Sequence, residues 1–251
     1  LDPKNDDVHN SLMGVKWAKR LSDRAQAAQF GGMFNKKGDG ADGGPGGKST
    51  ELYKEERGIP PWVGELPTVW LDLAVDGRVL GRVVIELFAP AAPKTCENFR
   101  SLCTGERGNG QLSKAPLHYR GVRFHRIIRN FLIQGGDIVS GDGMGGESVF
   151  GGQFGDENLE GKHDGPGIVS MANAGKDMNG SQFFITTTSA PHLDHHSVVV
   201  GRVVVGMEVV RMVERVAVDA NDCPIGEVMV DDCGGHATEI PHLPLPKSEW
   251  P

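Results

Sequence analysis

Short stretches of alternating apolar and polar residues, separated by glycine-rich turns, constrain the fold of this chain more than any other feature. The stretches 69–75 and 83–87 alternate on either side of the turn residues Asp76-Gly77. A period of two is typical of strands that bury one face, and Asp-Gly between two such strands predicts a hairpin. Further strands are expected at Ile168 to Met171, Gln182 to Thr187, Val198 to Val205 and Val228 to Val230.

Beyond residue 65, only two helical patterns accompany these strands. The first opens at Pro93, and proline is tolerated in the first turn of a helix. The second follows apolar residues spaced three apart from Met207 to Val216. Repeated short strands with only two helices favour a fold dominated by β-structure, a closed antiparallel barrel.

The first 65 residues are interpreted as an extension of this barrel. Residues 11–30 carry an apolar stripe with basic residues around it, which predicts an amphipathic helix capped near Ser11. Eight glycines between Gly31 and Gly47 predict a flexible linker over 31–48. The predicted organisation is an extension over 1–65, a barrel domain over 66–236 and an extended, proline-rich tail over 237–251.

Charge and composition argue against two classes of function. The chain carries a net charge of −7, and residues beyond Trp62 hold sixteen basic against twenty-four acidic residues. Nucleic-acid binding relies on clustered cations, so an acidic barrel is not expected to bind nucleic acid. The sequence has no stretch of eighteen apolar residues, so no membrane span is expected.

Cysteine content bears on the compartment. Four cysteines are too few for a secreted disulfide framework and lack the C-x-x-C spacing of a zinc site. A soluble, intracellular protein is therefore expected. The chain begins at Leu1 rather than Met, which leaves open either the cytosol or an organelle matrix reached after removal of a presequence.

The run 124–137, FHRIIRNFLIQGGD, places one arginine on an alternating apolar strand. Arg126 and Gln134 share the even register of this run, whereas Phe131 falls out of it. A turn or bulge at 129–130 would bring Phe131 onto the face of Arg126 and Gln134. A guanidinium, an aromatic ring and an amide would then converge on one pocket that holds a small apolar ring and donates a charged hydrogen bond.

Together with MANAG at 171–175 and NGSQFFI at 179–185, this run resembles the cyclophilins. Further matches follow in order, namely PKT at 93–95, ENFR at 97–100, CTGE at 103–106, DEN at 156–158 and GPG at 165–167. The resemblance covers roughly residues 66 to 236. It implies an eight-stranded antiparallel closed barrel capped by two α-helices. It also implies peptidyl-prolyl cis/trans isomerase activity on the outer face, with proline-containing peptides or unfolded proteins as substrates and no cofactor or metal.

The resemblance also implies roles for individual residues. Arg126 would donate a hydrogen bond to the twisted prolyl nitrogen, a set of apolar side chains would grip the proline ring, and two amides would hold the substrate backbone. The implied catalytic residues are Arg126, Phe131, Gln134, Asn173, Phe184 and Leu193. The implied substrate-binding residues are His125, Leu132, Ala172, Ala174, Gln182, His192 and Ser197.

The residues themselves leave simpler alternatives open at three of these positions. Arg126 would form only a surface salt bridge, and Phe184 and Leu193 would be ordinary barrel core. Two positions also depart from the common family pattern, because His192 stands where many cyclophilins have a tryptophan that contacts cyclosporin and Ser197 where a histidine is usual. Activity should survive both changes, since neither group polarises the nitrogen, whereas cyclosporin binding should weaken.

Two further patterns have a weaker functional interpretation. His192, His195 and His196 suggest a metal site, but the only carboxylate among them is Asp194, so a solvated loop is favoured. The sequence GDGMGG at 141–146 matches a dinucleotide fingerprint but no helical pattern follows it. We expect a loop that borders the substrate groove instead.

The loop 109–120 is longer than in the smallest cyclophilins and resembles their divergent-loop subgroup. In that subgroup, cysteines that match Cys103 and Cys233 can be close in space, and an acid that matches Glu157 can anchor the loop. The resemblance therefore allows a redox pair, Cys103 and Cys233, that regulates activity. Two inert buried thiols are the alternative, and a Cα separation above about 7 Å would exclude the bond.

A second functional interpretation concerns the extension. An amphipathic helix without an evident partner within the chain, a glycine-rich tether and a proline-rich tail suit a barrel that serves as a structural or docking subunit. Residues 1–65 would then anchor the barrel to a large protein assembly. This interpretation is compatible with an active isomerase.

Overall fold

The computed structural model describes residues 66–235. The helix expected at 11–30, the linker at 31–48 and the tail at 237–251 lie outside the described residues.

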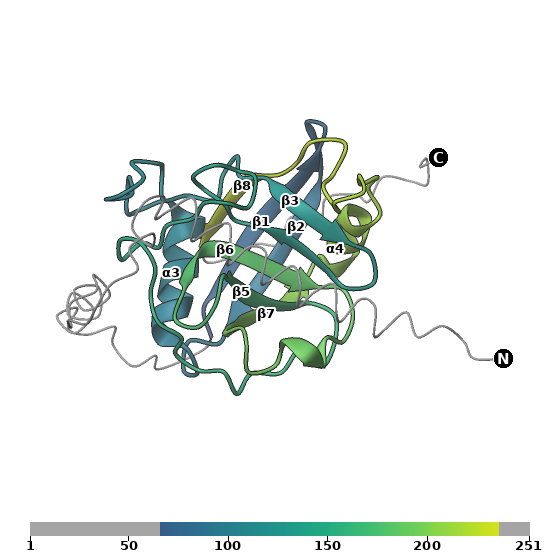
Figure 1. The fold of residues 1–251 in the computed structure, drawn as a ribbon. Helices are drawn as coiled ribbons and strands as arrows, with labels where there is room; N and C mark the ends of the chain where they lie inside the picture. Colours follow the sequence, from purple (N-terminus) through teal and green to yellow (C-terminus); the bar gives the residue numbers. More distant parts are fainter. Residues whose placement is uncertain (1–65, 236–251) are drawn as a thin grey trace, which may run out of the picture.

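Eight strands form one antiparallel sheet that curls into a barrel (Figure 1). They are β1 (Thr68–Val75), β2 (Arg78–Leu87), β3 (Phe124–Ile128), β4 (Leu132–Gly135), β5 (Ile168–Asn173), β6 (Asn179–Thr186), β7 (Val199–Val205) and β8 (Val228–Gly235). The order is β3-β4-β6-β5-β7-β2-β1-β8. Its two edges meet at a bridge between Arg123 and Met229, so the predicted antiparallel barrel is confirmed.

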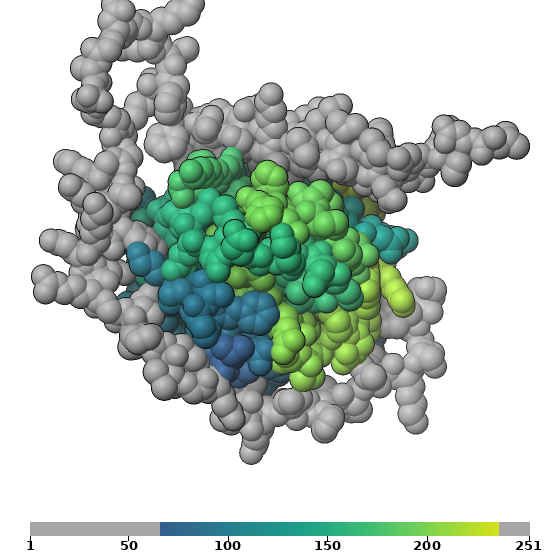
Figure 2. Space-filling model, turned by 90° about the horizontal axis from the view of Figure 1, so that it is seen from below, coloured from purple at the N-terminus to yellow at the C-terminus, as the bar shows by residue number. Residues whose placement is uncertain are grey.

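The predicted hairpin of β1 and β2 turns at Asp76-Gly77. Both residues have positive φ, 48° at Asp76 and 76° at Gly77. This conformation matches the right-handed twist of the flanking strands, and Asp-Gly is one of the few pairs that adopt it at low cost. In the space-filling view, blue residues from the beginning of the described range lie directly against yellow-green residues from its C-terminal part (Figure 2). The pairing of β2 with β7 brings such distant segments together.

Two helices cover the barrel, α3 (Pro93–Thr104) and α4 (Met207–Glu214), and a short 3-10 turn, η1, spans Pro191–Leu193. In Figure 1, α3 and α4 lie on opposite sides of the barrel. Helix α3 packs mainly on β8, with further contacts to β1 and β7, and α4 packs mainly on β2 and β4. Neither helix of the described range is long and apolar enough to cross a membrane.

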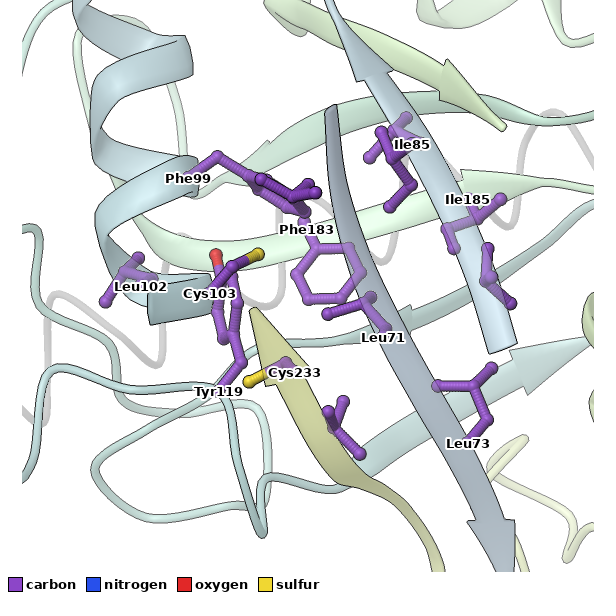
Figure 3. Close-up of a cluster of buried hydrophobic side chains, with 14 of the residues drawn as sticks. Leu71, Leu73, Ile85, Phe99, Leu102, Cys103, Tyr119, Phe183, Ile185 and Cys233 are labelled. Carbon is purple, nitrogen blue, oxygen red and sulfur yellow. The ribbon is translucent and has the colours of Figure 1, made fainter. Parts of the chain in front are cut away.

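The barrel interior is filled by side chains, among which Phe183 of β6 holds a central place (Figure 3). Its ring centroid lies 5.1 Å from that of Phe99, 5.0 Å from Tyr119 and 5.8 Å from Phe124. Since strand neighbours point to opposite faces, Phe184 points out of the barrel. The packed interior therefore leaves the outer face of β3, β4 and β6 to carry a site.

Candidate active site

A line of side chains crosses the outer face of four neighbouring strands. Arg126 of β3 pairs with Gln134 of β4, Gln134 pairs with Phe184 of β6, and Phe184 pairs with Ser170 of β5. Cross-strand partners in an antiparallel sheet share a face. The register therefore brings Arg126, Gln134 and Phe184 together, although 58 positions separate the first from the last.

Phe131 reaches the same region through a turn. Asn130 has a φ of 55°, a left-handed conformation that asparagine tolerates better than most residues. The turn reverses the chain between Ile128 and Leu132, which pair across the hairpin. The turn expected at 129–130 is therefore confirmed. The Phe131 ring stacks on the imidazole of His192, with centroids 5.0 Å apart and planes 29° apart.

The guanidinium of Arg126 is largely buried and contacts a carboxylate. Its Nη2 lies 3.3 Å from Oδ2 of Asp222, and the Arg126 side chain is only 10% exposed. Burial lowers the pKa of Arg126, and Asp222 opposes this effect. The alternative of a salt bridge is thus borne out in part: Arg126 does pair with Asp222, but the arginine is buried in the outer wall of the barrel, and within the pair only Asp222 is substantially exposed, at 38%.

Two amide side chains connect Gln134, the cross-strand partner of Arg126, to the glycine-rich loop 141–146. Nε2 of Gln134 donates to Oε1 of Gln182 (3.0 Å), and Nε2 of Gln182 donates to the carbonyls of Gly143 (2.9 Å) and Gly145 (2.6 Å). A pocket opens at this point. Its walls include Gln134, Gly143, Met144, Gly145, Gly146, Ala172, Asn173, Ala174, Met178 and Gln182. The expectation that the loop 141–146 borders a groove agrees with this geometry.

Five of the thirteen expected site residues therefore line one pocket, namely Gln134, Ala172, Asn173, Ala174 and Gln182. Arg126, Phe131, Phe184 and Leu193 do not line it. Phe184 lies two residues along β6 from Gln182, on the same face. The pocket and the arginine are thus adjacent parts of one outer surface, joined at Gln134.

The segment that contains η1 forms the edge beside Phe131. Nδ2 of Asn173 donates to the carbonyl of His196 (2.7 Å), which ties this segment to β5. Leu193 ends η1 and is partly buried, whereas Ser197 is only 7% exposed. Among residues 66–235, no group of three or more His, Cys, Asp or Glu side chains is arranged to hold a metal.

A buried histidine, His163, packs against Phe184. The sequence pattern did not identify this residue. His163 stacks on the Phe184 ring with centroids 5.8 Å apart. Its Nδ1 lies 3.0 Å from Oδ1 of Asp194, and its Nε2 lies 2.9 Å from Oγ of Ser170. This Ser-His-Asp arrangement resembles that of a hydrolase, but His163 and Ser170 are both fully buried. It therefore fixes Phe184 and cannot meet a substrate.

His125, the neighbour of Arg126, is a partly buried histidine whose ring lies against Gly143. Both ring nitrogens are buried and lack a hydrogen-bond partner among the described residues. Burial lowers the pKa of His125 to about 4. The folded protein therefore keeps this ring neutral at physiological pH.

The burial of His125 should make the stability of the protein depend on pH. As the pH falls below ~6.5, His125 becomes protonated in the unfolded chain but stays neutral in the folded chain. Above pH ~6.5, His125 is neutral in both states and does not lower the free energy of unfolding. As the pH falls toward 4, proton binding by the unfolded chain lowers the free energy of unfolding by up to about 3 kcal/mol. Urea unfolding at pH 7 and 4.5 measures the loss. It should be smaller in His125→Gln and unchanged in His195→Gln, an exposed control; equal losses in all three proteins would contradict the assignment.

The long loop at 109–120 is anchored by Glu147 rather than by Glu157. The Glu147 carboxylate accepts hydrogen bonds from the backbone N–H groups of Leu112 (3.0 Å) and Ser113 (2.8 Å). Glu157 instead accepts from the N–H groups of Lys94 (3.0 Å) and Thr95 (2.7 Å), at the start of α3. The expectation for Glu157 was wrong, because the free N–H groups of a helix N-terminus attract this carboxylate.

Cys103 and Cys233 lie beside Tyr119 in the core, and both are free thiols (Figure 3). Burial raises the pKa of Cys103 well above its usual value and that of Cys233 to about 12. Thiolates, not thiols, attack disulfides and alkylating agents. The redox pair stays a prediction, and the native fold opposes the first step of its formation.

Alkylation should therefore distinguish the four cysteines. Cys223 is exposed, whereas Cys96, Cys103 and Cys233 are buried. With iodoacetamide at pH 8, we expect one modification per native chain, at Cys223, and four after denaturation. Mass spectrometry with Cys223→Ser as control gives the count. Rapid modification of Cys103 in the native chain would contradict the burial argument and favour a redox role.

Comparison with known proteins agrees with this geometry. Residues 70–235 match the family model for cyclophilin type peptidyl-prolyl cis-trans isomerase/CLD. Over 175 residues the chain is 53% identical to a Rhizopus delemar protein named peptidyl-prolyl cis-trans isomerase cyp11, an alignment that covers 70% of this chain and 52% of that protein. The chain thus spans about half the length of this curated relative. It belongs to the cyclophilin-type peptidyl-prolyl cis-trans isomerase family.

Proposed function

We propose that this chain is a peptidyl-prolyl cis/trans isomerase that assists protein folding by acting on X-Pro bonds. The observation that carries the proposal is the cross-strand line on the outer face, in which Arg126 stands beside Gln134 and Phe184. A charged donor, an amide and an aromatic ring suit the polar and apolar parts of an X-Pro unit. Membership of the isomerase family supports the same reaction.

The proposed chemistry requires only a hydrogen bond. Amide resonance creates a rotational barrier of about 18–20 kcal/mol. As the bond twists, the prolyl nitrogen loses conjugation and its lone pair becomes an acceptor. A donor aimed at that nitrogen binds the twisted state more strongly than either planar isomer, so it lowers the barrier. Arginine suits this role because it stays protonated and presents five N–H donors in one plane.

The other residues of the site would hold the substrate. Phe184 and Leu132 would form the floor for the proline ring, with Phe131 and Leu193 at its edge. Gln134 and Asn173 would hold the substrate backbone. The pocket that includes Gln182, Ala172 and Ala174 would receive a neighbouring part of the peptide. His125, His192 and Ser197 would border the substrate.

Proline-limited refolding tests the proposal. The full chain should accelerate the slow phase of a substrate protein that folds with a trans-to-cis proline step, at catalytic concentrations and without added metal or cofactor. A substrate whose slow phase has no proline step is the control. A rate that stays at the uncatalysed value at all chain concentrations would contradict the proposal.

Cyclosporin should bind this chain weakly. The imidazole of His192, stacked on Phe131, offers less apolar area than the indole that many cyclophilins place here. We expect His192→Trp to tighten cyclosporin binding by about tenfold or more, as measured by inhibition of isomerase activity. His195→Trp, on the same loop, is the control. Nanomolar inhibition of the unmodified chain would show the prediction to be wrong.

A docking role in a larger assembly is a second candidate, favoured by the amphipathic pattern of residues 11–30. Residues 1–65 would anchor the barrel, and the isomerase site would remain open. Deletion of residues 1–48 should release the protein from its native complex while isomerase turnover is unchanged. An insoluble truncated chain would instead indicate that the helix packs on the barrel.

A further inference from the structure

The loop between α4 and β8 docks on β3 beside the proposed catalytic arginine. A bridge between Val218 and Pro224 closes the loop, and the backbone N–H of Ile225 donates to the carbonyl of Ala217 (3.0 Å). At its tip, the carbonyl of Asp222 accepts a hydrogen bond from the N–H of Ile127 (2.9 Å). Ile127 directly follows Arg126, so the tip of the loop is tied to the strand at the arginine itself.

Asp222 has a strained backbone that the loop holds in place. Its φ is 63°, in the left-handed region that few non-glycine residues adopt. Asp219 braces the tip, because its Oδ1 accepts from the N–H groups of Asn221 (2.8 Å) and Cys223 (2.9 Å). The backbone of Asp219 and Cys223 adds a further hydrogen bond of 2.8 Å. Strain that surrounding contacts maintain is common at functional sites.

The side chain of Asp222 completes a two-point contact with β3. While its carbonyl binds the backbone beyond Arg126, its Oδ2 lies 3.3 Å from Nη2 of the guanidinium. Elsewhere in the barrel, Arg82 and Asp72 form a paired contact with two bonds of 2.8 Å each. Asp222 instead contacts the guanidinium of Arg126 through Nη2. Such a contact orients the planar guanidinium from one edge.

We propose that Asp222 is a positioning residue that orients the guanidinium of Arg126 toward the substrate. This inference rests on the proposed function, because it assigns Asp222 a role only if Arg126 donates to the prolyl nitrogen. Asp222 need not touch the substrate. Its effect on the rate follows from alignment, since a small misplacement of a donor weakens its hydrogen bond in the twisted state.

Two substitutions at position 222 separate alignment from folding. Asp222→Gly removes the carboxylate and tolerates the positive φ, whereas Asp222→Asn keeps both the left-handed preference and an acceptor oxygen. Glu227→Gln is the control, because Glu227 pairs with the exposed Arg123 near the same loop (2.8 Å). Each full-length variant is assayed for kcat and KM on a proline peptide, and its thermal midpoint verifies the fold.

We expect Asp222→Gly to lower kcat about tenfold with KM within about twofold, Asp222→Asn to recover most of the loss, and Glu227→Gln to match the wild type. In an Arg126→Ala background, Asp222→Gly should have no further effect. If Asp222→Gly kept the wild-type kcat while Arg126→Ala was inactive, the role of Asp222 would be overturned and the proposed function would stand. An active Arg126→Ala would overturn the proposed function itself. An equal loss from Asp222→Gly in both backgrounds would show that Asp222 acts independently of Arg126.

Discussion

Replacement of Arg126 by alanine is expected to lower kcat/KM for a proline peptide by about 100-fold or more, because it removes the donor that stabilises the twisted amide. The fold should persist, since Arg126 lies on the outer face of the barrel while the core is formed by the opposite face of β3. A coupled isomerase assay gives the rate. Near-ultraviolet circular dichroism and the thermal midpoint verify the fold.

Two neighbouring substitutions sharpen this test. Arg126→Lys keeps the positive charge but loses the planar donors, so it should recover only part of the activity. Arg123→Ala removes an arginine from a surface ion pair with Glu227 and should keep full activity. If Arg126→Ala retained more than about a third of wild-type activity, another group would have to supply the catalytic hydrogen bond.

The Phe183→Ala variant is expected to lose about 3–5 kcal/mol of unfolding free energy, the typical cost of truncating a buried aromatic side chain. Phe183 is fully buried and contacts three other aromatic rings in the core. Urea unfolding measures the loss. Given that small domains are stable by only about 5–15 kcal/mol, such a variant should unfold at much lower urea.

The adjacent Phe184→Ala variant is the matched comparison. Phe184 points to the outer face, so its removal should cost at least about 1 kcal/mol less unfolding free energy than that of Phe183 and should raise KM for proline peptides. Equal stability losses with unchanged KM in Phe184→Ala would mean that Phe184 is ordinary packing, the simpler alternative raised by the sequence.

The local alternation of the sequence was sufficient to place Arg126 and Gln134 on one face of the sheet. Period-two alternation predicted that Arg126 and Gln134 share a face, and the pairing of β3 with β4 confirms it. The need for a turn at 129–130 followed from the same count, because Phe131 is out of register. Both inferences succeed because strand geometry repeats over a few residues and depends little on the rest of the chain.

Long-range partners could not be inferred in this way. Asp222 lies 96 positions from Arg126, and no periodic signal links the two. His163 has no distinctive spacing in the sequence that reveals its contacts with Ser170 and Asp194. These contacts depend on how the closed sheet and its loops pack, which is decided by many side chains at once.

The choice between Glu147 and Glu157 illustrates the same limit. Both acids lie in the same loop-rich region, and family resemblance suggested that Glu157 would anchor the long loop. Each carboxylate is bound by two backbone N–H groups, but those of Glu157 belong to the start of α3. Only the three-dimensional positions of the N–H groups distinguish the two roles.

Two-dimensional exchange NMR of a short peptide with one X-Pro bond tests the central claim most directly. With the full chain at a small fraction of the peptide concentration, the cis-to-trans exchange rate should rise well above its uncatalysed value of one event in tens to hundreds of seconds. The ratio of the two isomers should not change, because a catalyst lowers the barrier in both directions. Exchange that stays at the uncatalysed rate while the peptide visibly binds at the Arg126 face would contradict catalysis and leave only peptide binding for this surface.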